Sequence, residues 1–247
     1  GITLHEQGKF KKAIEAFQKA LSIKPDYSIA KHTLSALIGD TPKTAPREYV
    51  EGLFDKYAKE FDKSLLEKLE YKTPSLITDI LLKLTNNSSL GSILDLGCGT
   101  GLLGEKLKAH CSKLEGIDLS KKMLKLAEQK QVYDKLSHVD ITDYLSNSEL
   151  NFDYYISLDV FIYVGDLSEI FHLIKSKNQI SGKLVFSTEH TNEGNYNLLP
   201  SGRYAHSKGY ISSLCKQFDY EMLHFSTSDL RKEKSVFIEG GHYILGF

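Results

Sequence analysis

Apolar residues in the first part of the chain recur at helical spacing. Within residues 8–25 they are Phe10, Ala13, Ile14, Phe17, Ala20 and Leu21. Residues three, four and seven positions apart share one face of a helix, so this stretch predicts an amphipathic helix. A second apolar stretch follows before Gly39. We expect residues 1–38 to form a small helical hairpin.

A segment rich in proline separates this hairpin from the rest of the chain. Residues 39–47 read GDTPKTAPR, which predicts a linker. Helical spacing returns in residues 48–85, first in EYVEGLFDKYAKEFDKSLLEKL and then in KTPSLITDILLKL. In the second stretch Thr73 precedes Pro74, an order that favours a helix start.

From residue 92 onward, short apolar runs alternate with amphipathic stretches. The runs include SILDLG, KLEGIDLS, FDYYISLDVFIY and GKLVFSTE. YEMLHFS and GGHYILGF close the chain, joined by a long charged loop with no helix. The alternation predicts an α/β fold with a doubly wound, mostly parallel sheet of seven strands, and the ending predicts an antiparallel C-terminal β-hairpin. SGRYAHS (201–207) is expected to be irregular.

The composition argues against several classes of function. The chain has 247 residues with 31 basic and 32 acidic side chains, which gives no electrostatic footprint for nucleic acid. Its histidines lack metal-binding spacing and its three cysteines are scattered, so we expect neither a metal site nor disulfides. Without a long apolar run or a signal peptide, we expect a cytoplasmic protein. His5, His32, His110 and His138 are expected at the surface.

One stretch fits two cofactor patterns. Residues 93–104 read ILDLGCGTGLLG, which contains the G-x-G-x-x-G of dinucleotide-binding proteins and the D-x-G-x-G-x-G of methyltransferases that use S-adenosylmethionine. In both patterns the glycines let the backbone approach the ligand at a helix N-terminus. Asp118 ends the next strand and is placed to bind ribose hydroxyls in either case.

Three details favour S-adenosylmethionine. The strand SILDL leads into a turn made by Gly97, Gly99 and Gly101, and the dinucleotide pattern counted from Gly97 lacks its last glycine. Asp95 lies just before this turn, where a carboxylate attracts a sulfonium and an ammonium group but repels a pyrophosphate. Asp140 stands where a third strand is expected to end, and it can accept a hydrogen bond from an adenine amino group.

These segments resemble the class I methyltransferases that use S-adenosylmethionine, over about residues 47–247. The resemblance is carried by DLGCGTG, by GIDLSKKMLKLA and by the β-hairpin ending. It implies a cofactor site in which the methionine end meets Asp95, Gly97, Gly99 and Gly101, the ribose meets Asp118, the adenine meets Leu119, Met123, Asp140 and Ile141, and the sulfonium side meets Asp159.

The beginning of the chain narrows the resemblance. YVEGLFDKYAKEFD, the SGRYAHS segment and a helical start that resembles a tetratricopeptide repeat are together similar to a bacterial group of predicted methyltransferases with such repeats. This implies a catalytic domain over residues 48–247 that acts on a small-molecule acceptor. It also implies a helical lid over residues 48–85, in which Tyr57 covers the cofactor, and it leaves room for a protein partner at residues 1–38.

Residues for the acceptor are expected on the fifth strand and in the segment after it. The candidate catalytic side chains are Glu189, His190, Arg203, Tyr204 and His206. The planar guanidinium of Arg203 suits an acceptor carboxylate or phosphate, and His206 or Glu189 is a candidate base if the acceptor loses a proton. The alternative is structural: an ion pair for Arg203, a core position for Tyr204 and a solvated loop for His206.

Three accounts of the function stay open at this stage. The first is a methyltransferase that moves a methyl group from S-adenosylmethionine to a small molecule, at oxygen in preference to other atoms. The second is a non-catalytic scaffold or assembly factor that binds S-adenosylmethionine. The third is an NAD(P)-dependent oxidoreductase, which Asp95, the glycine spacing and the hairpin ending disfavour. The sequence specifies neither the acceptor nor the oligomeric state.

Overall fold

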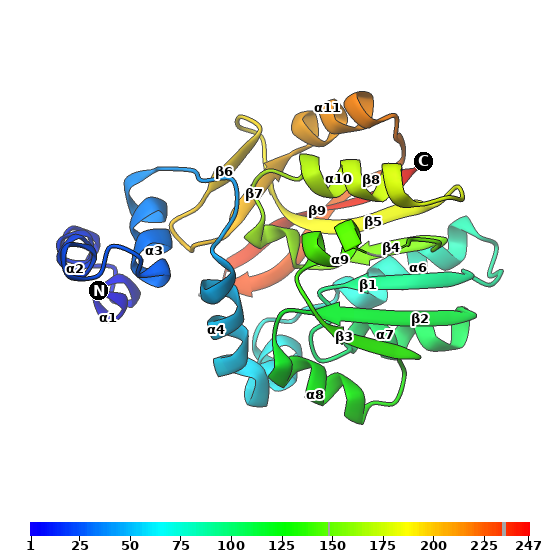
Figure 1. Cartoon of the computed structure of the whole chain (residues 1–247), viewed down its shortest axis with the longest axis horizontal. Helices are drawn as coiled ribbons and strands as arrows, with labels where there is room; N and C mark the ends of the chain where they lie inside the picture. The colour runs from blue at the N-terminus through cyan, green and yellow to red at the C-terminus, as the bar shows by residue number, and fades with distance from the viewer. Residues whose placement is uncertain (148, 234–235) are drawn as a thin grey trace.

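The computed structural model describes residues 1–147, 149–233 and 236–247. Three helices begin the chain and lie at the left of Figure 1: α1 (Ile2–Glu6), α2 (Phe10–Ile23) and α3 (Ser28–Ile38). α2 and α3 pack against each other through the buried side chains of Ala13, Phe17 and Ala30. The apolar face predicted from the spacing is therefore the face that joins the two helices.

The segment predicted as a linker is irregular but fixed in place. The carbonyl of Lys43 accepts hydrogen bonds from the N–H groups of Gly165 and Asp166, at 2.9 and 2.8 Å. The N–H of Ala45 donates to the carbonyl of Tyr163 at 3.0 Å. These bonds hold residues 39–47 against the main body of the protein.

Helical structure then continues with short interruptions. The elements are α4 (Arg47–Tyr57), η1 (Ala58–Glu60), α5 (Phe61–Lys63), the π-turn η2 (Ser64–Lys68) and α6 (Thr73–Leu84). α6 begins at Thr73 with Pro74 in its first turn, as the sequence predicts. Figure 1 shows α4 beside the ends of the central strands, between the N-terminal helices and the sheet.

The central sheet has the strand order β3–β2–β1–β4–β5–β9–β8. The five parallel strands are β1 (Ser92–Leu96), β2 (Lys113–Asp118), β3 (Lys135–His138), β4 (Tyr154–Ser157) and β5 (Lys183–Thr191). β8 (Glu221–Glu233) and β9 (Val236–Gly246) are antiparallel to each other, and β9 is antiparallel to β5. These seven strands confirm the doubly wound sheet with an antiparallel C-terminal hairpin.

Two parts of the sheet differ from the expectation. β6 (Tyr196–Leu198) and β7 (Tyr204–Ser207) form a second hairpin, and β7 pairs with the end of β5, so SGRYAHS is half strand. The stretch expected as a long charged loop is mostly paired, because β8 runs to Glu233 and β9 starts at Val236. Its polar side chains hid these strands because much of the hairpin is exposed to solvent.

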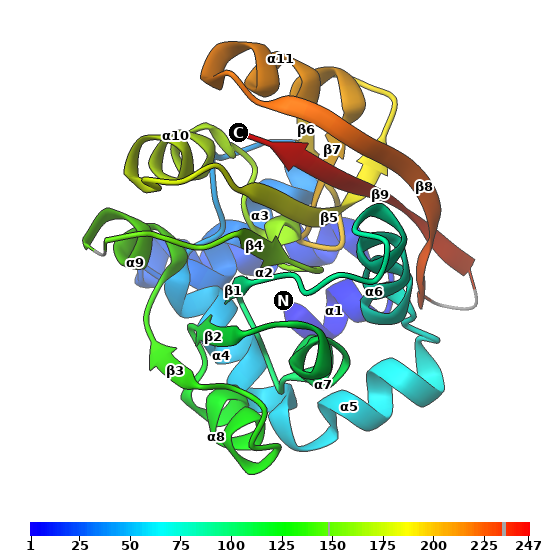
Figure 2. The same cartoon turned by 90° about the vertical axis from the view of Figure 1, so that its right-hand side faces the viewer.

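Helices cover both faces of the sheet. The remaining ones are α7 (Leu102–Leu107), η3 (Lys108–His110), α8 (Lys121–Gln129), α9 (Ile141–Asn147), η4 (Phe161–Tyr163), α10 (Ser168–Lys177) and α11 (Lys208–Phe218). On β1, Leu94 and Leu96 pack with Phe171 of α10, whereas Ile93 packs with Leu81 of α6. Figure 2 shows α9 and α10 on one side of the sheet and α6 and α7 on the other.

The strand order fixes where a ligand can enter. The chain moves outward from β1 to β2 and β3, and then returns to the other side of β1 as β4 and β5. The crevice of such a sheet lies where this direction reverses, at the carboxyl ends of β1 and β4.

Candidate active site

A cavity of about 740 Å³ lies at this position. Its volume is within the range of roughly 300–1,000 Å³ that is typical of cofactor and ligand pockets. The loops that follow β1, β2, β3 and β4 form one wall. Apolar residues of α4 and of the turns after it form the opposite wall: Leu53, Phe54, Tyr57, Phe61, Leu65 and Leu69. The helical segment after the linker therefore lies over the strand ends.

The glycine loop joins β1 to α7, and its three glycines adopt left-handed backbone conformations. The φ angles of Gly97, Gly99 and Gly101 are 79°, 55° and 88°, which side chains with a Cβ atom rarely adopt. Gly97 and Gly99 line the cavity. Gly101, also predicted to bind the cofactor, is not among the residues that line the cavity. A Cβ atom on Gly101 would lie 3.0 Å from the ring of Tyr133, so this glycine allows the loop to pack against Tyr133.

Asp118 closes β2 and holds the same loop. Its Oδ2 atom accepts a hydrogen bond from the N–H of Gly99 at 2.8 Å, and its Oδ1 atom accepts one from the N–H of Ser120 at 2.7 Å. Burial raises the pKa of Asp118, and these two hydrogen bonds act against the rise. Each carboxylate oxygen has a second lone pair, so Asp118 can still accept hydrogen bonds from a ligand in the cavity.

Asp95 is a buried acid beside the loop. Its Oδ2 atom accepts a hydrogen bond from the hydroxyl of Tyr133 at 2.7 Å. Burial raises the pKa of Asp95 to about 7, with a further contribution from the charge of Asp118. A cation placed beside this carboxylate would lower its pKa again, so the position suits a positively charged ligand group.

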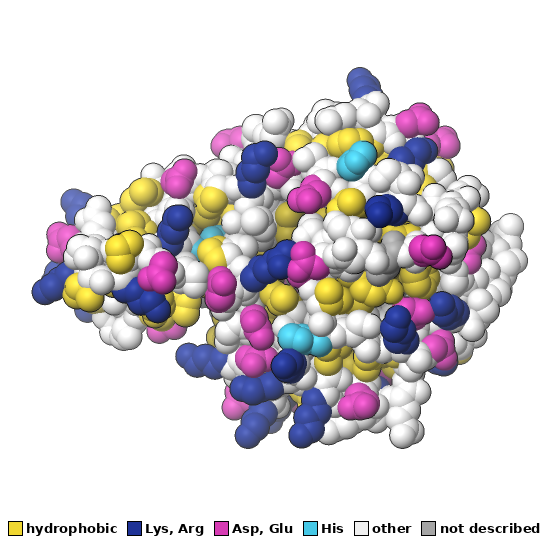
Figure 3. Space-filling model, viewed as in Figure 1, with side chains coloured by type: hydrophobic (Ala, Val, Ile, Leu, Met, Phe, Trp, Pro, Cys, Tyr) yellow, Lys and Arg dark blue, Asp and Glu magenta, His cyan; other side chains and the backbone are white. Residues whose placement is uncertain are grey.

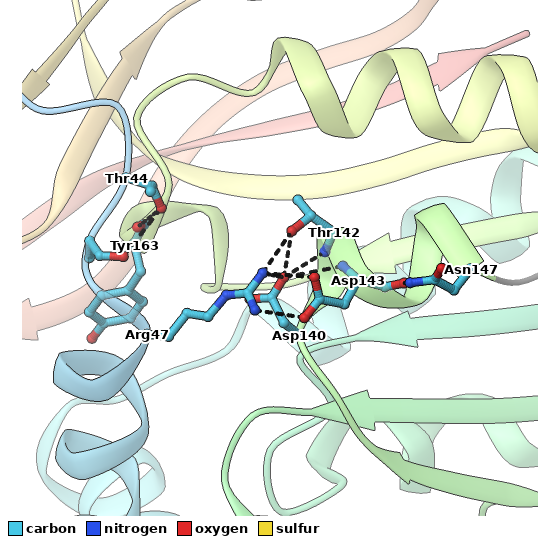
Figure 4. Close-up of polar contacts among 8 residues, drawn as sticks. Thr44, Arg47, Asp140, Thr142, Asp143, Asn147 and Tyr163 are labelled. Carbon is cyan, nitrogen blue, oxygen red and sulfur yellow. Dashed lines mark hydrogen bonds and ion pairs between the residues drawn. The ribbon is translucent and has the colours of Figure 1, made fainter.

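Asp140 follows β3 and is held by Arg47, the first residue of α4. Figure 4 shows the guanidinium of Arg47 bound to both Asp140 and Asp143. Nη2 of Arg47 lies 3.0 Å from Oδ1 of Asp140, and Nη1 lies 2.6 Å from Oδ2 of Asp143. Oδ1 of Asp140 also accepts hydrogen bonds from the N–H and the hydroxyl of Thr142. Asp140 and Ile141 both line the cavity.

Two more polar contacts join this helical segment to the strand ends. The hydroxyl of Ser120, the N-cap of α8, donates to Asp55 of α4 at 2.6 Å. The hydroxyl of Thr100, in the glycine loop, donates to Asp62 of α5. Together with the contacts of Arg47, the helical segment from α4 to α5 has polar contacts to each of the three loops that follow β1, β2 and β3.

Charged residues gather at the other end of the cavity. Glu189 on β5 is only 2% exposed, and one of its oxygens accepts hydrogen bonds from Nε of Arg203, at 2.6 Å, and from Nη2 of Arg231. Nη1 of Arg231 donates to Asp159 at 2.6 Å, and Nη2 of Arg203 donates to Glu233. Asp159 and both arginines line the cavity, so this end presents two guanidinium groups held by carboxylates.

Several predicted residues lie elsewhere. His206 is fully buried, its Nε2–H donates to the carbonyls of Val164 and Gly165, and burial lowers its pKa to about 4. It is therefore not the solvated or base-like residue expected at the opening. Tyr204 is buried in the cluster that joins α3 to the β6–β7 hairpin. The ring of His190 packs against Phe225, and Met123 is fully buried in α8 rather than on the cavity wall.

Three residues near the cavity escaped the sequence analysis. Arg231 lies in the stretch expected as a loop, and only the register of the β8–β9 hairpin places it beside Glu189. Arg47 and Tyr133 belong to no recognisable motif. Arg47 contacts Asp140 and Tyr133 contacts Asp95, and each contact joins segments far apart in the chain. His32 is also misplaced by the sequence analysis, because it is buried rather than at the surface.

The charges on the surface shown in Figure 3 do not favour one class of ligand over another. Basic and acidic side chains are interspersed on the face shown in Figure 3. Within the described parts of the chain, no cluster of three His, Cys, Asp or Glu side chains is arranged to hold a metal ion. None of the helices described above combines the length and the hydrophobicity needed to cross a bilayer.

Two families match parts of the chain: the methyltransferase domain over residues 93–177 and the tetratricopeptide repeat over residues 1–27. An uncharacterized protein of Haemophilus influenzae is 35% identical over 118 residues, which are 44% of this chain and 46% of that protein. A ubiquinone biosynthesis O-methyltransferase of Coxiella burnetii is 29% identical over 131 residues, which are 47% of this chain and 56% of that enzyme. The chain spans about half the length of the curated relatives it matches.

Solved structures share the fold at low sequence identity. An S-adenosylmethionine-dependent methyltransferase from Clostridium acetobutylicum matches with a TM-score of 0.57 and 21% identity, over 78% of this chain and 98% of that chain. The 1,6-didemethyltoxoflavin-N1-methyltransferase of Burkholderia thailandensis, solved with S-adenosylhomocysteine, matches with a TM-score of 0.61 and 13% identity, over 84% and 92%. Residues 93–177 therefore match the methyltransferase domain, residues 1–27 match the tetratricopeptide repeat, and the chain shares the fold of solved S-adenosylmethionine-dependent methyltransferases.

Proposed function

We propose that this protein transfers a methyl group from S-adenosylmethionine to a small-molecule acceptor, at oxygen in preference to other atoms. The observation that carries the proposal is the convergence of Asp95, Asp118 and Asp140 on one cavity. The relatives named as ubiquinone biosynthesis O-methyltransferases support the preference for oxygen.

The cofactor end follows from these carboxylates. Asp95 with the glycine loop would hold the ammonium and carboxylate of the methionine part, Asp118 the ribose hydroxyls, and Asp140 the adenine amino group. When bound, S-adenosylmethionine supplies an electrophilic methyl carbon. Asp95 supports this cofactor over NAD(P), because its described hydrogen-bond partner is a neutral hydroxyl and a buried carboxylate would repel a pyrophosphate.

The acceptor end is assigned to Arg203 and Arg231. Their planar guanidinium groups suit a carboxylate or another anionic oxygen. The described residues that line the cavity include no histidine. Burial raises the pKa of the buried Tyr71 and of the half-buried Tyr163, two tyrosines that line the cavity, so both stay neutral. An acceptor oxygen that is already anionic needs no general base, and we therefore favour a carboxylate or an acidic hydroxyl as the acceptor.

The remaining predicted residues have supporting roles in this proposal. Glu189 holds both arginines, and Asp159 holds Arg231 near the expected sulfonium position. Tyr57 lines the cavity but is 52% exposed, so it would cover the cofactor at the open edge of the lid. We assign the catalytic domain to residues 48–247 and the lid to residues 48–85. A protein partner at residues 1–38 stays a prediction.

The proposal is tested by isothermal titration calorimetry with S-adenosylhomocysteine and, in parallel, with NAD. We expect micromolar binding of the first and none of the second. Asp118→Asn should weaken binding, whereas Asp79→Asn, a change of an exposed carboxylate on α6, should not. Binding of NAD alone would make the proposal wrong, and binding of neither would favour the non-catalytic scaffold.

If S-adenosylhomocysteine binds, transfer of a radiolabelled methyl group to a panel of carboxylic acids, phenols, alcohols and amines identifies the acceptor class. We expect turnover with the acids or the phenols. Turnover confined to amines or simple alcohols would refute the assignment of an anionic oxygen.

A further inference from the structure

We infer that the N-terminal helices support the acceptor site from outside the cavity, and that His32 of α3 is a positioning residue for Arg203. The catalytic meaning of this inference rests on the proposed function, but the contacts that carry it do not. They connect a helix of the repeat-like segment to the wall of the cavity through one turn, residues 199–203, between β6 and β7.

The turn is held from the side of α3. The Nε2–H of the buried His32 donates to the carbonyl of Gly202 at 2.8 Å. The ring of Tyr49, from α4, packs on His32 with a centroid distance of 4.4 Å. At the outer edge of the turn, the Nε2–H of His5 donates to the carbonyl of Pro200 at 2.9 Å. Two histidines from the N-terminal helices therefore bond successive parts of one turn.

The backbone of the turn has a conformation that suits glycine, and it makes two hydrogen bonds of its own. Gly202 has a φ angle of 82°, and a Cβ atom there would lie 2.8 Å from the hydroxyl of Tyr49, so only glycine fits. The N–H of Gly202 donates to the carbonyl of Leu199, and the N–H of Leu199 donates to the carbonyl of Arg203, both at 2.8 Å. The carbonyl that His32 binds belongs to the residue directly before Arg203.

Arg203 connects the turn to the cavity, because its backbone follows Gly202 and its side chain lines the cavity. Its side chain is 18% exposed, lines the cavity and donates from Nε to the buried Glu189 at 2.6 Å. Because Glu189 also binds Arg231, a shift of the Arg203 backbone would disturb both guanidinium groups. His32 is not among the described residues that line the cavity, so its effect on an acceptor would pass through the turn.

The Nε–H signal of Arg203 in a nitrogen-15 NMR spectrum of the full chain tests this inference without an acceptor. Arg203→Lys assigns the signal by removing it. In the parent protein we expect slow exchange with solvent, because the Nε–H is bonded to a buried carboxylate. His32→Phe fills the same space without a donor, and it should shift the signal and speed its exchange at least tenfold. His32→Gln, which supplies a new donor, should restore most of the parent behaviour.

Lys31→Ala is the matched control, because Lys31 is the exposed neighbour of His32 on the same helix. It should leave the Arg203 signal unchanged. If His32→Phe folds and keeps the parent signal and exchange rate, or if Lys31→Ala disturbs them equally, the inference is wrong. If His32→Phe does not fold, His5→Ala removes the outer contact to the turn, and an unchanged Arg203 signal in that variant would overturn the inference.

A binding measurement separates this inference from the proposed function. Benzoate, as a simple carboxylate, is titrated into protein saturated with S-adenosylhomocysteine. We expect benzoate to bind at least fivefold more weakly to His32→Phe than to the parent, with the affinity for S-adenosylhomocysteine unchanged within twofold. If benzoate does not bind the parent protein, the anionic acceptor is refuted, and the NMR result still decides whether His32 positions Arg203.

Discussion

Asp118 and Gly99 are joined by a hydrogen bond of 2.8 Å from the backbone N–H of the glycine to the carboxylate. The residue proposed to bind the ribose thus also fixes the loop proposed to bind the methionine part. Because the N–H of Ser120 donates to the other oxygen, one carboxylate sets the backbone at the ends of two strands. A change at Asp118 therefore acts on both halves of the cofactor site.

We expect Asp118→Ala to weaken binding of S-adenosylhomocysteine by roughly 10- to 150-fold, the equivalent of the roughly 1.5–3 kcal/mol typical of hydrogen bonds to charged groups. Asp118→Asn keeps one oxygen acceptor and should lose less. Calorimetric titration measures both variants, with Asp79→Asn as the control. An Asp118→Ala protein that binds as tightly as the parent would contradict the ribose contact.

Binding of S-adenosylhomocysteine should depend on pH through Asp95. Burial raises the pKa of this acid to about 7, so the unliganded protein is mostly protonated there at pH 6 and mostly ionised at pH 8. The ammonium group of the ligand prefers the carboxylate, so affinity should rise from pH 6 to pH 8 and then level off. Titrations at several pH values check this. The same rise in Asp95→Asn would show that another group is responsible.

The same shift predicts a pH dependence of stability. The pKa of Asp95 in the folded protein lies above the value of about 3.9 for an unfolded chain, so the folded protein binds more protons between about pH 4 and pH 7. The contribution of Asp95 to the free energy of unfolding therefore falls as the pH rises through this window. From pH 5 to pH 8, the free energy of unfolding should fall less, or rise more, in Asp95→Asn than in the parent, as urea unfolding can show. An equal change in both would contradict the assignment.

The residues of the proposed cofactor site could be selected from the sequence because their signals are local. Asp95, the glycines and Asp118 stand at the ends of predicted strands, and parallel strands bring their carboxyl ends to one edge. The proposed acceptor site depends instead on the register between strands. Arg231 meets Glu189 only because a long hairpin lies beside β5, and no spacing in the chain encodes that pairing. His206 was misplaced because a short added strand turns its ring toward the interior, onto two carbonyls.

Two buried histidines should destabilise the protein in acid. Burial lowers the pKa values of His206 and His242 to about 4, compared with about 6.5 in an unfolded chain. As the pH falls from about 6.5 to 4, the unfolded chain takes up protons that the folded protein does not, so stability falls by up to roughly 3 kcal/mol for each histidine. His206→Gln keeps a donor for the two carbonyls and should remove part of this loss, as urea unfolding at pH 7 and pH 4.5 can show. His172→Gln, a change of an exposed histidine of α10, should leave the acid sensitivity unchanged; if it reduces the loss as much as His206→Gln, the assignment to buried histidines is wrong.

Arg231 and Glu189 should be strongly coupled in stability. The arginine side chain is 6% exposed and the glutamate 2%, so removing one partner leaves a charge in a buried place. We expect Arg231→Met to cost about 3–5 kcal/mol in the free energy of unfolding, the range for a broken buried pair.

The double variant Arg231→Met/Glu189→Gln should lose clearly less than the sum of the two single variants, because it removes both charges. Lys175→Met provides the comparison, since Lys175 pairs at 3.7 Å with the fully exposed Asp219 and surface pairs contribute at most about 1 kcal/mol. Equilibrium unfolding in urea of the four proteins of the cycle measures the coupling. Additive losses would show that the two side chains stabilise the fold independently, and that the shared carboxylate does not hold the arginine pair together.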